Sequence, residues 1–180
     1  MAADPLVTAW SRKVRLSDVQ RGAERLELKA DAGERERLAR ELAVDGVESA
    51  QADVTVRGWQ DGLQADGRWR ARVTQTCGVS LEPFSTDLSG VFEVRAVPAD
   101  SPLAAYQEPE GDIGLETPDP PDVLADDDTI DVAALVAEHL SLEIDPYPRK
   151  PGVEWEAPEA SEPESPFAVL STLKPRGGDA

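Results

Sequence analysis

Apolar and polar residues alternate along several stretches of the first hundred positions. The period is two in residues 25–29, 50–59 and 67–74, which is typical of strands with one buried face. A further valine-rich stretch, residues 88–97, ends at Pro98, which lacks the N–H that a sheet ladder needs. Residues 60–62 carry turn chemistry, so we expect the second and third stretches to form a hairpin.

Two other stretches have the spacing of helices. Asp31 is followed three positions later by Glu34, which is typical of a capping box, and Leu38 and Leu42 then fall on one helical face. We expect that helix to stop near Gly46. A second helix is predicted for residues 131–144, with Asp131 as its N-cap and with a packed face that comprises Leu135, Val136, Leu140 and Leu142.

A short third helix is predicted at residues 166–174. Pro166 suits the first helical position, and Phe167, Leu170 and Leu173 follow at threefold spacing. A helix of two turns is not stable alone. It therefore either docks on this chain or binds a groove on a partner, and the sequence leaves both alternatives open.

Charge and proline divide the chain unevenly. The 180 residues carry a net charge of -18, and residues 97–180 hold 20 acidic side chains against 4 basic ones. Most prolines also follow position 97, where they limit regular structure. We expect an α+β fold, a mainly antiparallel β-sheet or partly open barrel with two to three helices, in one domain over residues 1–152. The domain would hold an acidic, proline-rich insertion at 99–127, and residues 153–180 would form an acidic tail.

Several classes of protein are disfavoured. With one cysteine, Cys77, and one histidine, His139, the chain can form neither an internal disulfide nor a zinc site of soft ligands. Cys77 has no Lys or Arg near it in sequence except Arg72, so we expect a buried or half-buried thiol rather than a reactive one. Phosphate loops and nucleophile elbows are absent, so we expect no catalysis, cofactor, metal or small-molecule substrate. Without a long apolar run or a signal-like start, we expect a cytoplasmic protein that does not enter a membrane.

A row of arginines is the first candidate site. Arg68, Arg70 and Arg72 alternate with apolar residues, so they should share one face of a strand, with Arg57 beside them on the facing strand. Such a row could contact RNA phosphates. It could also be the solvated outer face of a sheet, which the strong negative charge of the chain favours. A third interpretation is that the acidic segment at 122–128 folds back onto the row.

Acidic and apolar residues of the second half are the other candidates. Asp126, Asp127 and Asp128 lack the spacing of a calcium loop, and they are explained more simply as a solvated loop before a helix. We expect binding of a protein partner to involve these acids and the apolar positions of the short helix, which gives the set Asp126, Asp127, Asp128, Phe167, Leu170 and Leu173.

Two blocks of the chain resemble a known family. The first block includes Cys77, Leu81, Pro83 and Phe84, and the second runs from Ile130 through its helix to the prolines beyond it. In order and spacing they resemble the YceD family, the large ribosomal RNA subunit accumulation proteins of bacteria. Many members carry Cys-x-x-Cys in the first block, whereas this chain has Ser80 at the second position, so no metal or redox role is carried over. In the second block the residues that match the family are Asp131, Leu135, Glu138, Leu140, Pro146 and Pro148.

The resemblance implies a small non-enzymatic factor needed for normal 23S rRNA levels. An acidic chain suits cationic partners. We therefore expect an accessory factor of large-subunit assembly that binds basic ribosomal proteins or assembly factors. Direct binding of 23S rRNA through the arginine row is the first alternative. An adaptor that presents the helix at 166–174 to a cytoplasmic protein is the second.

Overall fold

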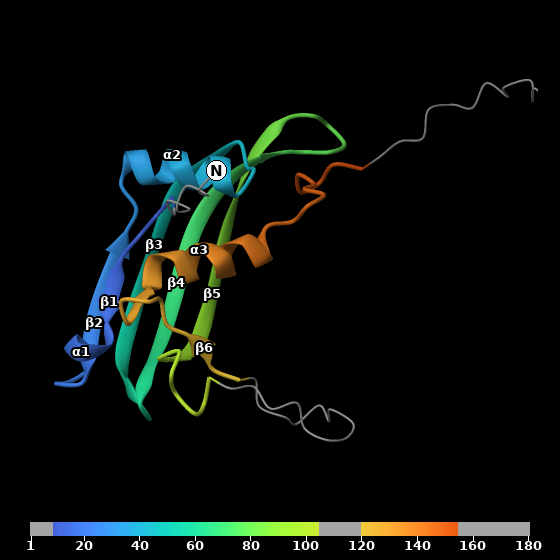
Figure 1. Ribbon diagram of the computed structural model, residues 1–180. Coiled ribbons are helices and arrows are strands. Elements are labelled where there is room, and N and C mark those ends of the chain that lie inside the picture. Colours follow the sequence, from blue (N-terminus) through green and yellow to red (C-terminus); the bar gives the residue numbers. More distant parts are fainter. Residues whose placement is uncertain (1–8, 105–119, 155–180) are drawn as a thin grey trace, which may run out of the picture.

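The computed structural model describes residues 9–104 and 120–154. Its main element is a five-stranded sheet in the order β2-β3-β4-β5-β6 (Figure 1). β2 (Glu24–Lys29), β3 (Gly46–Trp59), β4 (Gly62–Thr76) and β5 (Pro83–Val97) pair antiparallel, and β6 (Asp122–Val123) pairs parallel with the end of β5. The sheet does not close, so the expected α+β fold is confirmed as a mostly antiparallel open sheet with helices.

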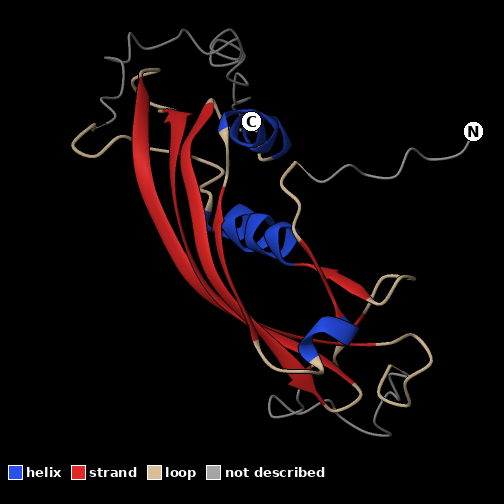
Figure 2. Cartoon of the chain, turned by 90° about the vertical axis from the view of Figure 1, so that its left-hand side faces the viewer, coloured by secondary structure: helices blue, strands red, loops and turns tan. Residues whose placement is uncertain are grey.

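Helices cover one face of the sheet. α2 (Ala32–Glu41) and α3 (Val132–Glu143) lie on the concave side of the curved strands, and the convex side carries no helix among the described residues (Figure 2). A short helix, α1 (Leu16–Val19), follows β1 (Lys13–Arg15), which pairs antiparallel with β7 (Thr129–Asp131). We call the helix-covered side of the sheet the inner face and the other side the outer face.

Alternation along the strands places the core on the inner face. Val54, Val56, Leu63 and Val73 are fully buried there, together with Leu140 of α3. Two glycines make room for aromatic rings from the neighbouring strand. Gly67 lies opposite Phe92, and Gly90 lies opposite Trp69. A Cβ atom at Gly90 would lie 2.8 Å from Cζ2 of Trp69, so the indole can lie flat against the strand only because this position has no side chain.

The capping box of α2 forms as the sequence predicts. The Asp31 carboxylate accepts from the Glu34 amide, and the Glu34 carboxylate accepts from the Asp31 amide. The end of the helix differs from the prediction. α2 ends at Glu41, because Ala43 takes a positive φ of 53° and turns the chain, and Gly46 is the first residue of β3.

The strands are longer than the alternation indicates. β3 begins at Gly46, β4 ends at Thr76 and β5 begins at Pro83, because pairing between neighbouring strands continues into polar residues that lack a period-two pattern. The short elements β1, α1, β6 and β7 have no sequence pattern that predicted them. Their partners lie far away in the sequence, so local periodicity carries no signal for them.

The predicted packing of Leu142 is wrong. The side of α3 that faces the sheet consists of Ala133, Val136, Ala137 and Leu140, which recur at spacings of three and four. Leu142 lies about 200° around the helix from Leu140. It is therefore 81% exposed, and Leu135 is half-buried.

Asp131 is the N-cap of α3, and it also holds the N-terminal segment. Its Oδ1 accepts from the amides of Ala133 and Ala134 at 3.2 Å and from the amide of Arg12 at 2.7 Å. Its Oδ2 accepts from the Ser11 hydroxyl at 2.5 Å. One carboxylate thus joins the start of α3 to a segment 119 positions earlier.

We predict that Asp131→Ala lowers the free energy of unfolding by about 2–3 kcal/mol, because it removes a helix cap and charge-assisted hydrogen bonds. Asp131→Asn should cost less, since an asparagine oxygen still caps a helix. Urea denaturation followed by circular dichroism measures both. Equal midpoints for Asp131→Ala and the unchanged chain would contradict this role.

Candidate interaction surfaces

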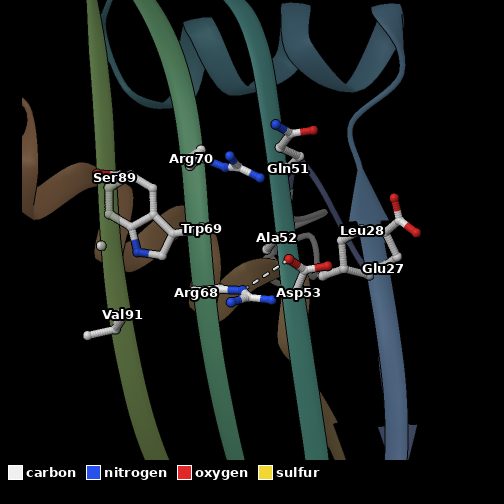
Figure 3. A pocket seen from close by; sticks show the side chains of 11 residues that line it. Glu27, Leu28, Gln51, Ala52, Asp53, Arg68, Trp69, Arg70, Ser89 and Val91 are labelled. Carbon is white, nitrogen blue, oxygen red and sulfur yellow. Dashed lines mark hydrogen bonds and ion pairs between the residues drawn. The ribbon is translucent and has the colours of Figure 1, made fainter.

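The four arginines of the predicted row lie on the outer face. Arg68, Arg70 and Arg72 alternate with buried Trp69, Ala71 and Val73 along β4, and Arg57 lies opposite Gln64, a residue of the same face. Figure 3 shows Arg68 and Arg70 beside Gln51 and Asp53 of β3. The period-two pattern therefore placed the row on a single face.

Carboxylates from neighbouring strands face most of this row. Arg57 pairs with Asp66 at 3.3 Å and Arg68 with Asp53 at 3.2 Å. Arg72 bonds both Glu48, at 3.0 Å, and Asp87, at 2.9 Å. Within the described ranges only Arg70, of these four, has neither an ion pair nor a hydrogen bond from its side chain. The outer face is thus a surface of both charge signs.

The acidic partners of the row come from the sheet itself. The described acids of the 122–128 segment make no ion pair with the four arginines, so the interpretation that this segment folds back onto the row is wrong for the described residues. Hydrogen bonds from Ser85 and Thr74, and then the nearby Arg72, lower the pKa of Glu48. That carboxylate therefore stays ionised opposite its arginine.

A groove of about 630 Å³ crosses the middle of the outer face (Figure 3). Its walls carry Arg68 and Arg70 on β4, Gln51 and Asp53 on the neighbouring β3, and Glu27 on β2. Trp59, the other aromatic residue near the row, lies under Arg95, whose guanidinium is 5.3 Å from the ring centroid. Because both signs of charge line the groove, it lacks the continuous positive potential that a nucleic-acid backbone requires.

The second candidate surface is the acidic turn at residues 125–128. The Asp128 amide donates to the Ala125 carbonyl at 2.8 Å, and the Asp128 carbonyl accepts from the Leu16 amide at 3.0 Å, which fixes the turn against α1. Asp127 pairs with Lys13 at 3.8 Å. A hydrogen bond from Thr129, and then Lys13, lower the pKa of Asp127.

Asp126 and Asp128 differ from Asp127 in this turn. Both are exposed, and the described part of the chain gives their carboxylates no hydrogen bond or ion pair. These two are therefore the acids of the turn that can face a partner. The apolar positions Phe167, Leu170 and Leu173 lie outside the described residues, so their helix stays a prediction.

Part of the family motif comes together at one end of the sheet. Cys77 and Leu81 lie in the connection between β4 and β5, Pro83 opens β5, and Pro148 lies beyond α3. The Gly78 amide donates to the Pro148 carbonyl at 2.9 Å. The Lys150 ammonium pairs with Glu82 at 2.8 Å. The two blocks, separate in the sequence, thus form one contact region.

Cys77 lies at the centre of this contact. Its side chain is fully buried, and Sγ accepts from the backbone amides of Lys150, at 3.3 Å, and of Val79 and Ser80, at 3.4 Å. The Lys150 amide, followed by the side chain and backbone of Ser80, lowers the pKa of the thiol to about 6. The sequence predicts burial but misses the amide that stabilises the thiolate, because Lys150 is 73 positions away.

The lowered pKa gives a pH-dependent stability with a defined sign. The folded thiol ionises near pH 6, whereas an ordinary thiol ionises near 9.0, so the folded state is stabilised above that range and loses the stabilisation as pH falls through 6. We predict that Cys77→Ser, which cannot ionise, destabilises the protein more at pH 8 than at pH 5.5. Denaturation midpoints of both forms at the two pH values measure this. If the difference in midpoint between the two forms were the same at both pH values, Cys77 would be a neutral thiol in the folded protein.

Two negative findings limit the chemistry of the described ranges. Residues 9–104 and 120–154 hold no group of three or more His, Cys, Asp or Glu side chains that could bind a metal ion. None of the helices in these ranges is long and apolar enough to cross a membrane.

Comparison with known proteins gives one family. Residues 65–174 match the model of a family described as large ribosomal RNA subunit accumulation protein YceD. The match spans β4, β5, the acidic turn, α3 and the contact region around Cys77. No curated protein and no solved structure matches the chain. With more than half of its length matched, the chain belongs to the YceD family of large ribosomal RNA subunit accumulation proteins.

Proposed function

We propose that this protein is a non-enzymatic accessory factor that supports the accumulation of 23S rRNA by binding basic ribosomal or assembly proteins. The description of its family, large ribosomal RNA subunit accumulation protein, supports a role in ribosome biogenesis. Its net charge of -18 favours association with cationic proteins. Once rRNA binds such a protein, the RNA phosphates neutralise the positive charge that attracts this chain.

The ion pairing of the outer face supports a protein partner over RNA. Arg57, Arg68 and Arg72 each already face a carboxylate. RNA phosphates would have to displace these carboxylates while approaching a strongly negative chain. The exposed carboxylates of Asp126 and Asp128, by contrast, can receive a cationic side chain without breaking a contact within the described residues.

We predict that Asp126→Asn with Asp128→Asn weakens binding of basic large-subunit proteins several-fold at low ionic strength. The difference should disappear near about 0.5 M salt, where charges a few ångströms apart are already screened. Affinity capture with the tagged full chain, with and without nuclease, measures binding. Asp18→Asn with Asp61→Asn removes the same charge from the N-terminal half and is the matched control. If both double variants lost the same amount of binding, the effect would depend on net charge alone and not on the position of Asp126 and Asp128.

Direct RNA binding is the second candidate, and Arg70 favours it. Its side chain lacks an acidic partner among the described residues, and it lies beside the groove of the outer face. If this mode operates, Arg70→Ala should reduce nuclease-sensitive retention of 23S RNA, whereas Arg68→Ala should reduce it less because Arg68 already binds Asp53. Retention that is unchanged in Arg70→Ala and in the triple variant of Arg68, Arg70 and Arg72 would exclude the outer face as an RNA site.

A further inference from the structure

One long sheet edge has no partner among the described residues. β5 pairs with β4 along its whole length, but on its other side β6 pairs only with Ala96 and Val97. From Pro83 to Arg95 no described residue makes a backbone hydrogen bond on that side. Unpaired strand edges are sites where another chain can add a strand.

The hydrogen bonds at the end of β5 show which residues face this open edge. The Val97 carbonyl accepts from the Leu124 amide, so Val97 faces β6, whereas the Ala96 carbonyl lies against Gly62 and faces β4. The amide and carbonyl of one strand residue point the same way, and successive residues alternate. The register of β4 with β5 continues without a bulge. The open edge therefore consists of the backbone groups of Ser85, Asp87, Ser89, Val91, Glu93 and Arg95.

Two of the usual protections against strand addition, proline and a bulge, are absent from residues 84–95, and the charged side chains of the edge are Asp87, Glu93 and Arg95. Exposed edges in native proteins are commonly blunted by lysine, proline or a bulge. Residues 84–95 contain neither lysine nor proline, and their ladder is regular. Val91 is 79% exposed at the centre of the edge. A long, regular edge with an exposed valine has the features of a surface that can bind an added strand.

The charges along the edge favour a cationic segment. Glu93 pairs with Arg95, whereas Asp87 and Glu48 share the single guanidinium of Arg72, so the surplus negative charge beside the edge lies at Asp87. The side chains of Asp87 and Glu93 are 75% and 51% exposed. On the outer face Glu93 is next to Val91, and Asp87 is separated from Val91 by Ser89. A second copy of this chain is a poor occupant, because two chains of net charge -18 repel each other.

We propose that the open edge of β5 receives an extended segment of a basic protein as an added strand, an inference that depends on the proposed function. Basic side chains of that segment would lie opposite Asp87 and Glu93, and a small apolar side chain would lie opposite Val91. The backbone hydrogen bonds give affinity, and the alternating side chains give the preference for a cationic sequence.

Val91 is the position for the first test. Val91→Lys puts a positive charge, which repels a cationic segment, at the centre of the edge. Because Val91 is exposed, we expect this variant to fold. Val91→Pro removes an amide that faces the open side and leaves the ladder with β4 intact. Leu142→Lys is the matched control, because Leu142 is equally exposed and gains the same charge on α3.

Binding is measured with tagged full-length chains and with proteins extracted from purified large ribosomal subunits. We expect Val91→Lys and Val91→Pro to weaken retention of basic proteins at least about tenfold in Kd, and Leu142→Lys to retain them. Unchanged retention in both Val91 variants would overturn the edge inference and leave the proposed function standing. Failure of the unchanged chain to retain any basic protein would overturn the proposed function, and the inference with it.

Amide hydrogen exchange by NMR tests the edge directly. In the free full chain the amides of Asp87, Ser89, Val91 and Glu93 should exchange fast, and those of Leu88, Gly90 and Phe92 slowly, because the latter bond β4. The fast amides should become protected when a retained basic protein is added. Protection in the free chain at all concentrations would mean that another part of this chain covers the edge, and protection that rises with concentration would mean self-pairing. Either result would overturn the proposal.

Discussion

The carboxylate of Asp131 is the interaction on which the arrangement of the two layers depends. It caps α3, and it also accepts from Ser11 and from the backbone of Arg12. These contacts set where the helix begins relative to β1, and β7 continues directly into that helix. Because α3 begins at a fixed point, its apolar side reaches the middle of the sheet. The aspartate of the family motif thus has a structural role.

α3 can pack on the inner face because small and large side chains alternate between the strands of that face. Gly67 and Gly90 face aromatic rings, and the Phe92 ring meets that of His139 at a centroid distance of 5.0 Å. The His139 Nδ1–H donates to the Leu135 carbonyl at 2.8 Å, which holds the imidazole in place. The lone histidine is thus part of the packing between helix and sheet. Large residues on one strand fill the space that glycine leaves on the next.

Local patterns were sufficient to predict the elements whose signal is local. The alternation of β4 predicted that Arg68 and Arg70 share a face, and the capping box predicted the start of α2. The neutralisation of the arginines could not be predicted, because Asp53 and Asp87 reach them only through strand register. The same holds for Cys77, whose thiolate is stabilised by an amide from the segment beyond α3. The prediction for Leu142 was wrong because Leu140 and Leu142 are two positions apart, so a helix places them on nearly opposite sides and only one of them can face the sheet.

The pairing of β1 with β7 has a consequence for synthesis on the ribosome. Val14 is synthesised well before its partner Ile130, and most of the described fold lies between them in the sequence. At about 5–20 residues per second, the N-terminal segment waits on the order of 6–20 s for that partner. The hairpins of β3, β4 and β5 can form in the meantime, since their contacts are local. The pairing of β1 with β7 therefore has to wait until the strands between them have been synthesised.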